Sequence, residues 1–177
     1  RELRQSPPGK NYRYRTKGDM EVVLPLSRAL GKDFVHQLNG MYALALYDRG
    51  DDSLLLVRDR LGIKPLYWTR LESGGILYAS EIKALFASSL IEPEVDERAV
   101  SAYLAHGYVP SPATLFKGVN KLPPGHLLEA SGDNSMRVER YWRAGMAADL
   151  PKDRDAIEDH LISLLRDSVG LQLRSDV

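Results

Sequence analysis

The 177-residue sequence contains no cysteine, and this absence excludes several kinds of chemistry from it. Disulfides, cysteine-based zinc or iron–sulfur sites and a cysteine nucleophile all need the missing thiol. An excess of one charge is also missing, because 24 Lys and Arg residues balance 24 Asp and Glu residues, so a nucleic-acid-binding surface is disfavoured. The longest uninterrupted apolar run, Met41–Tyr47, is far too short to cross a membrane. We therefore expect a cytoplasmic protein with neither nucleic acid nor a membrane as partner.

The residues that are present predict a globular protein built around β-structure. Hydrophobic residues make up 44% and charged residues 27% of the chain, as in ordinary globular proteins. The apolar segment Gly40–Asp48 and its neighbour Ser53–Val57 predict a hairpin, and Leu66–Thr69 with Ile76–Ala79 predicts a second. Short connections favour one antiparallel sheet, and the apolar run indicates a layer covering each of its faces.

The segment before this sheet predicts a short strand and a helix. Alternating tyrosines and arginines suggest a strand at Asn11–Thr16. Asp19, after a glycine turn, is in position to cap a helix that ends at Gly31. Pro25 lies inside this helix and is expected to bend it. The apolar positions at helical spacing are Val22, Val23, Leu26, Ala29 and Leu30.

Four further elements follow the predicted sheet. A short helix at Ser80–Ser88 precedes a second helix that Asp96 caps. A proline-rich connector at Gly107–Gly125 leads to a small hairpin at the end of the region. The apolar face of the second helix consists of Val100, Tyr103 and Leu104, and the hairpin of His126–Ala130 and Met136–Tyr141.

A linker at Ala144–Lys152 separates this region from a final amphipathic helix. Asp155 and Glu158 resemble a capping box at the start of that helix. Its apolar stripe has no evident partner upstream, so it is expected to open a second domain. The stripe contains Ile157, Leu161, Leu164, Leu165 and Val169. Both ends of the chain lie within or directly behind such elements, and we expect it to be an internal piece of a longer protein.

Few side chains stand out as catalytic. The four histidines, at positions 36, 106, 126 and 160, are scattered without metal-ligand spacing, so no metal site is predicted. The segment Arg58–Tyr67 is dense in charge, but by itself it is best explained structurally, with Arg58 and Asp59 bonding buried backbone groups and Gly62 and Pro65 shaping the turn. Asp19 is either a helix cap or a carboxylate that holds the ammonium group of a ligand, and its spacing alone favours the cap.

Five ordered motifs of the chain match those of one enzyme family. Leu38–Asp48 resembles the family's LNGMFAFALWD, and Arg58–Tyr67 resembles RDRLGIKPLYY. Tyr78–Leu85 resembles FASEIKAL, Leu115–Val119 resembles LFKGI, and Lys121–His126 resembles KLPPGH. One such match could arise by chance, whereas five in the same order are specific. Together they resemble the glutamine-hydrolysing asparagine synthetases.

The resemblance implies an α+β fold: an incomplete four-layer αββα sandwich of the N-terminal-nucleophile hydrolase type, followed by the first helix of an α/β ATP-pyrophosphatase-type synthetase domain. Residues 1–143 would be the C-terminal part of the amidotransferase domain with its connector, 144–152 the linker and 153–177 the truncated start of the synthetase domain, its first helix. In this family an N-terminal cysteine, with its own α-amine as base, releases ammonia from glutamine. ATP, with Mg²⁺, activates aspartate, which the ammonia converts to asparagine. The implied partners are glutamine, the synthetase part of the same polypeptide and a possible second copy in a homodimer.

Residue by residue, the resemblance carries over one ligand contact. Thr16, Gly18, Asp19 and Glu21 match the motif (T/S)-x-(S/G)-D-x-E, which implies that Asp19 binds the α-ammonium group of glutamine. Arg1–Leu3 matches the helix after the family's Asn-Gly-Glu element, and Ser175–Val177 the residues before its SGGLDS loop. The nucleophile and the ATP loop are therefore expected outside this chain, which alone would be inactive.

Two other interpretations stay open. In the first, the domain is the scaffold of a related ligase, such as a β-lactam synthetase, that has lost the nucleophile. The chain could also be an interaction module.

Overall fold

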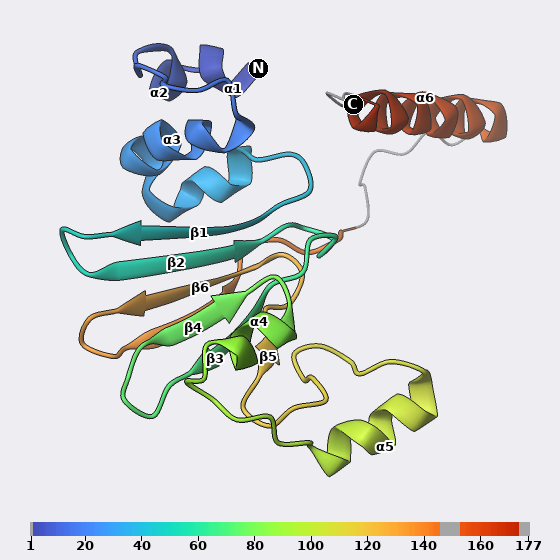
Figure 1. The fold of residues 1–177 in the computed structure, drawn as a ribbon. Coiled ribbons are helices and arrows are strands. Elements are labelled where there is room, and N and C mark those ends of the chain that lie inside the picture. The colour runs from blue at the N-terminus through green and yellow to red at the C-terminus, as the bar shows by residue number, and fades with distance from the viewer. Residues whose placement is uncertain (1, 146–152, 174–177) are drawn as a thin grey trace. The chain divides into compact units, whose positions relative to one another are not determined.

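The computed structural model describes residues 2–145 and 153–173. The chain divides into two compact units, residues 1–143 and residues 144–177, and each is described by itself. The first unit is layered, with helices, two sheets and further helices in succession (Figure 1). No helix of the described residues is long and apolar enough to cross a bilayer.

The first layer is helical and begins at the N-terminus. Its short helices stack on one face of the larger sheet, as Figure 1 shows for α3 above β1 and β2. Gly31 ends α3 with a positive φ of 56°, a conformation that glycine adopts without strain. The elements are α1 (Glu2–Gln5), α2 (Pro7–Lys10), the 3₁₀-helix η1 (Asp19–Val22), α3 (Val23–Leu30) and the 3₁₀-helix η2 (Gly31–Gln37).

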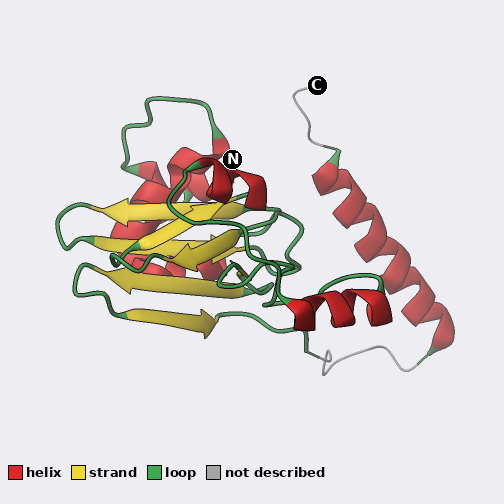
Figure 2. Ribbon diagram, turned by 60° about the horizontal axis from the view of Figure 1, so that its bottom comes forward, coloured by secondary structure: helices red, strands yellow, loops and turns green. Residues whose placement is uncertain are grey.

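The strands form two antiparallel sheets rather than the single sheet expected from the sequence. A four-stranded sheet has the order β1-β2-β6-β7, and a three-stranded sheet has the order β4-β3-β5. Both predicted hairpins before residue 80 form, but they belong to different sheets. Figure 2 shows the strands of the two sheets in yellow. Their bounds are β1 (Ala43–Asp48), β2 (Ser53–Arg58), β3 (Tyr67–Arg70), β4 (Ile76–Ala79), β5 (Asn120–Lys121), β6 (His126–Ser131) and β7 (Met136–Arg140).

Two cores explain the order of the layers. One face of β2 and β6 carries Val57 and Leu127 toward Leu26 and Phe34 of the helical layer. The opposite face carries side chains toward the smaller sheet, in a cluster of Leu56, Leu66, Leu122 and Leu128. Alternate residues of each strand therefore serve different cores. The prediction that a sheet is covered on both faces is confirmed for the centre of the larger sheet.

The strand β1 itself is not covered on both faces, as its apolar run had suggested. It is an edge strand, and only Leu44 among its residues is buried. The helix α4 (Ile82–Ala87) buries Leu85 and packs against β4, completing the fourth layer. The αββα arrangement expected from the resemblance is thus confirmed.

The helix α5 (Glu97–His106) begins as predicted, because the Asp96 carboxylate accepts a hydrogen bond from the Arg98 N–H. Its predicted apolar face is wrong, however. Ala99 is the buried residue of α5, whereas Tyr103 and Leu104 are 48% and 79% exposed.

Three predictions near the N-terminus are wrong. No strand forms at Asn11–Thr16, which follows an irregular path. Asp19 is not a cap, since Gly18 holds that position and Asp19 is the first residue of η1. The expected bend at Pro25 is instead a change from 3₁₀- to α-helix at Val23. Pro25 therefore falls in the first α-helical turn, where a missing N–H is tolerated.

The second unit contains α6 (Arg154–Gln172), which confirms the predicted final helix. Its N-cap is Asp153, whose carboxylate accepts from the Ala156 N–H, two residues before the predicted cap. The third helical residue is Ala156, so the predicted capping box does not form. Glu158 instead accepts a hydrogen bond from Arg154 at 2.9 Å. The linker residues 146–152, and the expectations placed on Arg1 and on residues 175–177, lie outside the described residues.

Candidate functional site

Asp19 lies at the end of an irregular segment that joins α2 to η1. The segment begins after Gly9, a buried residue at which an added Cβ would come within 2.2 Å of the Leu3 carbonyl oxygen. Such an approach leaves no room for any side chain, so glycine is required where α2 packs on α1. Within the segment, the rings of Tyr12 and Tyr14 contact edge to face with centroids 5.0 Å apart.

Arg4 binds this segment from α1. Its Nη2 donates hydrogen bonds to the carbonyl oxygens of Thr16 at 3.1 Å and Gly18 at 2.8 Å. Its guanidinium also lies 4.1 Å from the centroid of the Tyr14 ring, within range of a cation–π interaction. One side chain thereby fixes the backbone on both sides of Lys17, directly before Asp19.

Glu21 holds the same segment from the other side. Its Oε1 accepts the Arg15 N–H at 2.7 Å, and its Oε2 accepts the Thr16 N–H and the Thr16 hydroxyl, both at 2.7 Å. The Thr16 hydroxyl oxygen in turn accepts the Gly18 N–H at 3.2 Å. These bonds, first that from the Arg15 N–H and then that from the Thr16 hydroxyl, lower the pKa of the Glu21 carboxyl.

The Asp19 carboxylate is left available by this arrangement. Asp19 is exposed, and no hydrogen bond or ion pair to its carboxylate occurs among the residues that the structure describes. Arg4 and Glu21 hold the backbone of Arg15, Thr16 and Gly18, directly before Asp19. A fixed, unpaired carboxylate is suited to bind a cationic group such as an ammonium.

The Arg58–Tyr67 segment has the structural role expected from its composition. Asp59 is 1% exposed, and its carboxylate accepts the N–H groups of Leu61, Ile63 and Lys64 at 2.9–3.1 Å. Arg58 donates to the carbonyl oxygens of Gly62 and Lys64 within the segment and of Leu122 outside it. No side chain of this pair is left free for a ligand.

Sequence reasoning did not identify Arg4 as a member of the site. Its contacts depend on the irregular path of residues 11–18, whose alternating tyrosines and arginines instead predicted a strand. Glu21 was visible as part of the matched motif but had no assigned task. The tyrosines 42 and 141, whose hydroxyls lie 2.9 Å apart, were also missed, because 99 residues separate them.

The histidines that lie in the first unit make packing contacts. The ring of His36 meets Tyr141 edge to face at 6.0 Å, and His126 Nδ1 lies 2.7 Å from the Pro124 carbonyl oxygen. Within residues 2–145 and 153–173, no three His, Asp or Glu side chains are grouped so as to hold a metal ion.

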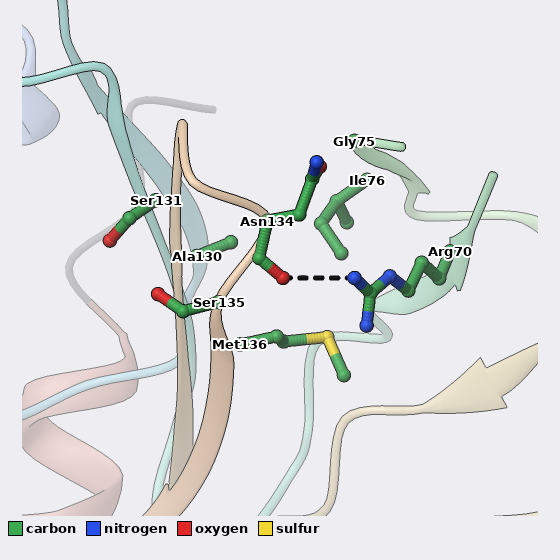
Figure 3. Close-up of a pocket in the computed structure, with 8 residues that line it drawn as sticks. All are labelled: Arg70, Gly75, Ile76, Ala130, Ser131, Asn134, Ser135 and Met136. Carbon is green, nitrogen blue, oxygen red and sulfur yellow. Dashed lines mark hydrogen bonds between the residues drawn. The ribbon is translucent and has the colours of Figure 1, made fainter. Parts of the chain in front are cut away.

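A small cavity lies where the β3–β4 and β6–β7 turns meet (Figure 3). Arg70 of β3 donates a hydrogen bond to the Asn134 carbonyl oxygen at 2.9 Å across it. The cavity encloses only about 20 Å³, the space of a single water molecule, so it cannot hold an amino acid.

Comparison with known families gives one match. Residues 1–142 match the model described as "Glutamine amidotransferase domain". Asparagine synthetases [glutamine-hydrolyzing] 3 and 1 of Bacillus subtilis are 34% and 31% identical to this chain over 180 and 176 residues. Both alignments cover 99% of this chain, but only 28% and 27% of the relatives. The chain thus spans about a quarter of the length of these curated relatives.

Two further matches differ in kind. Amidase chry2 of Gibberella zeae is 31% identical over 169 residues, which cover 94% of this chain and 24% of that protein. Among solved structures, glutamine phosphoribosylpyrophosphate amidotransferase from B. subtilis, complexed with ADP and GMP, superposes with a TM-score of 0.54 at 19% identity. That superposition covers 81% of this chain and 27% of the other, and it supports the fold alone.

Proposed function

Because the chain belongs to the family of glutamine amidotransferase domains found in the glutamine-hydrolysing asparagine synthetases, we propose that it is part of an enzyme that takes ammonia from glutamine. The ammonia would amidate an activated carboxylate, that of aspartate or of a related acceptor, at the expense of ATP. In this proposal α6 is the first helix of the synthetase domain, and the rest of that domain is the partner of the first unit.

The exposed carboxylate of Asp19, which has no hydrogen-bond or ion-pair partner among the described residues, is the observation that supports the proposal. A glutaminase must distinguish free glutamine from the many side-chain amides of proteins, and the α-ammonium group is what free glutamine alone presents. The exposed carboxylate of Asp19 offers it a charge-assisted partner, and Arg4 and Glu21 fix the backbone beside it before the ligand arrives. Preorganisation of this kind reduces the entropy lost on binding.

The 177 residues by themselves should release no ammonia. They contain no cysteine to attack the glutamine amide. They also offer ATP and Mg²⁺ no fitting site among the described residues, which hold neither a glycine-rich phosphate loop nor a carboxylate cluster. In the proposal these groups bind other parts of the parent protein, and no step of nucleotide chemistry is assigned to this chain.

The test is an Asp19→Asn substitution in the full-length protein that contains this chain. Glutamine-dependent product formation should fall roughly 10- to 100-fold in kcat/KM, because one charge-assisted hydrogen bond to the substrate is lost. Product formation from added ammonium chloride should not change, since this route bypasses the glutamine site. Asp33→Asn, at an exposed aspartate of η2, is the matched control and should leave both activities intact.

An equal loss of the glutamine- and ammonia-dependent activities would indicate damage to the fold rather than to glutamine binding. Unchanged glutamine kinetics would remove Asp19 from the site. Reading the residue after the initiator methionine of the full gene separates the alternative, a scaffold domain of a ligase such as a β-lactam synthetase. Cysteine supports the glutaminase, and any other residue supports the scaffold.

A further inference from the structure

A second, larger cavity lies on the side of the first unit where β5 and β7 form the outer edges of the two sheets. It has a volume of about 320 Å³, at the lower end of the range typical for small-molecule sites. Trp68, Asn120 and Lys121 line it from the smaller sheet, and His126, Val138 and Arg140 from the larger one. None of these residues belongs to the glutamine site proposed around Asp19.

The strand registers explain why these side chains meet. Trp68 pairs with Asn120 across β3 and β5, and Trp68 belongs to the core between the sheets. His126 pairs with Arg140 across β6 and β7, two residues along from the pair that Val138 makes with Leu128 of the same core. Residues two apart on a strand share a face, so His126, Val138 and Arg140 all face the smaller sheet.

The walls are rigid and largely flat. Pro112 and Pro123 complete the lining, beside the Trp68 indole and the Val138 side chain. Prolines and an indole lose little conformational freedom when a ligand packs on them, and their flat surfaces suit a planar ring.

The polar groups of the lining are rich in cations and contain no carboxylate. Arg140 is exposed, whereas Lys121 is half-buried and donates to the Val109 carbonyl oxygen at 2.6 Å. Neither cation forms an ion pair within the described part of the chain. Burial, and then the nearby Arg58 guanidinium, lower the pKa of Lys121, as expected for a cation that lacks a counter-charge.

The indole N–H of Trp68 is a further unused donor. Its nitrogen is buried and has no hydrogen-bond partner among the described residues. A buried indole N–H usually finds a partner, because leaving it unpaired costs free energy. This nitrogen is shielded from solvent, so the indole meets the cavity through its ring and not through its N–H. A negatively charged ligand would therefore pair with Arg140, the exposed cation of the lining.

We propose that this cavity binds a small aromatic carboxylate, with its ring between the prolines and the indole and its carboxylate toward Arg140. Lys121 pairs with Tyr67, so its side chain lies on the face of β5 opposite Asn120 and adds positive charge without touching the ligand. The probe is benzoate, titrated into the ¹⁵N-labelled 177-residue chain and followed by NMR. The chain has two tryptophans, so the indole signal of Trp68 should shift saturably while that of Trp142, which does not line the cavity, stays in place.

Three comparison ligands separate charge from shape. Benzamide, with the same ring and no charge, should have an affinity at least about tenfold lower than that of benzoate. Benzylammonium, with the opposite charge, and inorganic phosphate, with charge but no ring, should not saturate the Trp68 signal. Benzamide binding as tightly as benzoate, phosphate saturating the site, or a benzoate shift that never saturates would each overturn the proposal.

Two variants test the residues. Arg140→Gln should weaken benzoate binding about tenfold, because it removes a charge-assisted hydrogen bond. Arg137→Gln is the matched control, since Arg137 is exposed on the same strand but on its other face. An equal loss in both variants would mean non-specific attraction and would overturn the site. Should Arg140→Gln fail to fold, Arg140→Met keeps much of the apolar stem and removes the charge, and it must then weaken binding as read from the Trp68 indole signal.

Discussion

Two loops of the first unit are each held by an arginine and a carboxylate, yet they differ completely in burial. In one, Arg58 donates to backbone carbonyl oxygens and Asp59 accepts three backbone N–H groups. In the other, Arg4 donates to two carbonyl oxygens and Glu21 accepts two N–H groups and a hydroxyl. Asp59 is 1% exposed, whereas the bonds of Glu21 lie at the surface.

The difference in burial changes what the bonds accomplish. The Asp59 carboxylate is itself buried, so its three bonds fix the turn that leads from β2 to β3 and contribute to global stability. Arg58 extends this to the smaller sheet through the Leu122 carbonyl oxygen. Around Glu21, water can take over, so the bonds contribute little to global stability. They select one path for the segment that precedes Asp19.

The first prediction tests this division directly. Asp59→Ala should lower the free energy of unfolding by about 3–5 kcal/mol, because it removes a buried carboxylate and leaves three N–H groups of the turn without their acceptor. Glu21→Ala should have a far smaller effect, since its partners become hydrated. Urea unfolding of both variants of the 177-residue chain measures the difference. Equal destabilisation would show that burial does not distinguish the two loops.

The second prediction concerns the turn that Asp59 stabilises. Gly62 has a φ of 68°, and an added Cβ would lie 2.7 Å from Pro124 Cγ, so Gly62→Ala should cost about 2–3 kcal/mol. Gly75 is the matched control, because its φ of 84° is also positive but its Cβ would meet open space. Gly75→Ala should cost only about 1 kcal/mol. Similar losses of stability would mean that Pro124 moves aside.

The hairpins and the role of the Arg58–Tyr67 turn could be predicted from the sequence, whereas the path of the loop before Asp19 could not. The Arg58–Tyr67 turn follows a strongly apolar strand and contains Gly62 and Pro65, so its structural use of charge could be read from local composition. The three hairpins were likewise signalled by turn residues between apolar runs.

The path of the loop before Asp19, residues 11–18, could not be predicted, because it is set by side chains distant in sequence. Arg4 reaches Gly18 across 14 residues, and no periodicity marks such a contact. The alternation of Tyr12 to Arg15 is typical of a strand, but with no neighbouring strand to pair with, the segment remains irregular. The division into two sheets was missed for a similar reason, since β6 joins β2 from over 60 residues away. Asp19 could nevertheless be proposed from the sequence, because the motif around it is local.

The last prediction concerns Glu21, the carboxylate with the smaller expected effect on stability. Glu21→Gln in the full-length protein should raise the KM for glutamine several-fold while leaving ammonia-dependent activity unchanged, because a looser Thr16–Asp19 segment pays an ordering cost on binding. Glu72→Gln, at an exposed glutamate in the β3–β4 turn, is the control and should change neither.

Acid should erase the small difference in stability that Glu21→Gln causes in the 177-residue chain. Folding lowers the pKa of the Glu21 carboxyl, so its stabilising contribution is complete above the ordinary range of glutamate and is lost as the pH falls through the lowered value. Urea unfolding at a series of pH values should therefore show wild type and Glu21→Gln converging in acid, whereas Glu72→Gln stays parallel to wild type. A gap between wild type and Glu21→Gln that is constant down to strongly acidic pH would show that the carboxylate charge does not hold this loop, and would leave Arg4 alone to position Asp19.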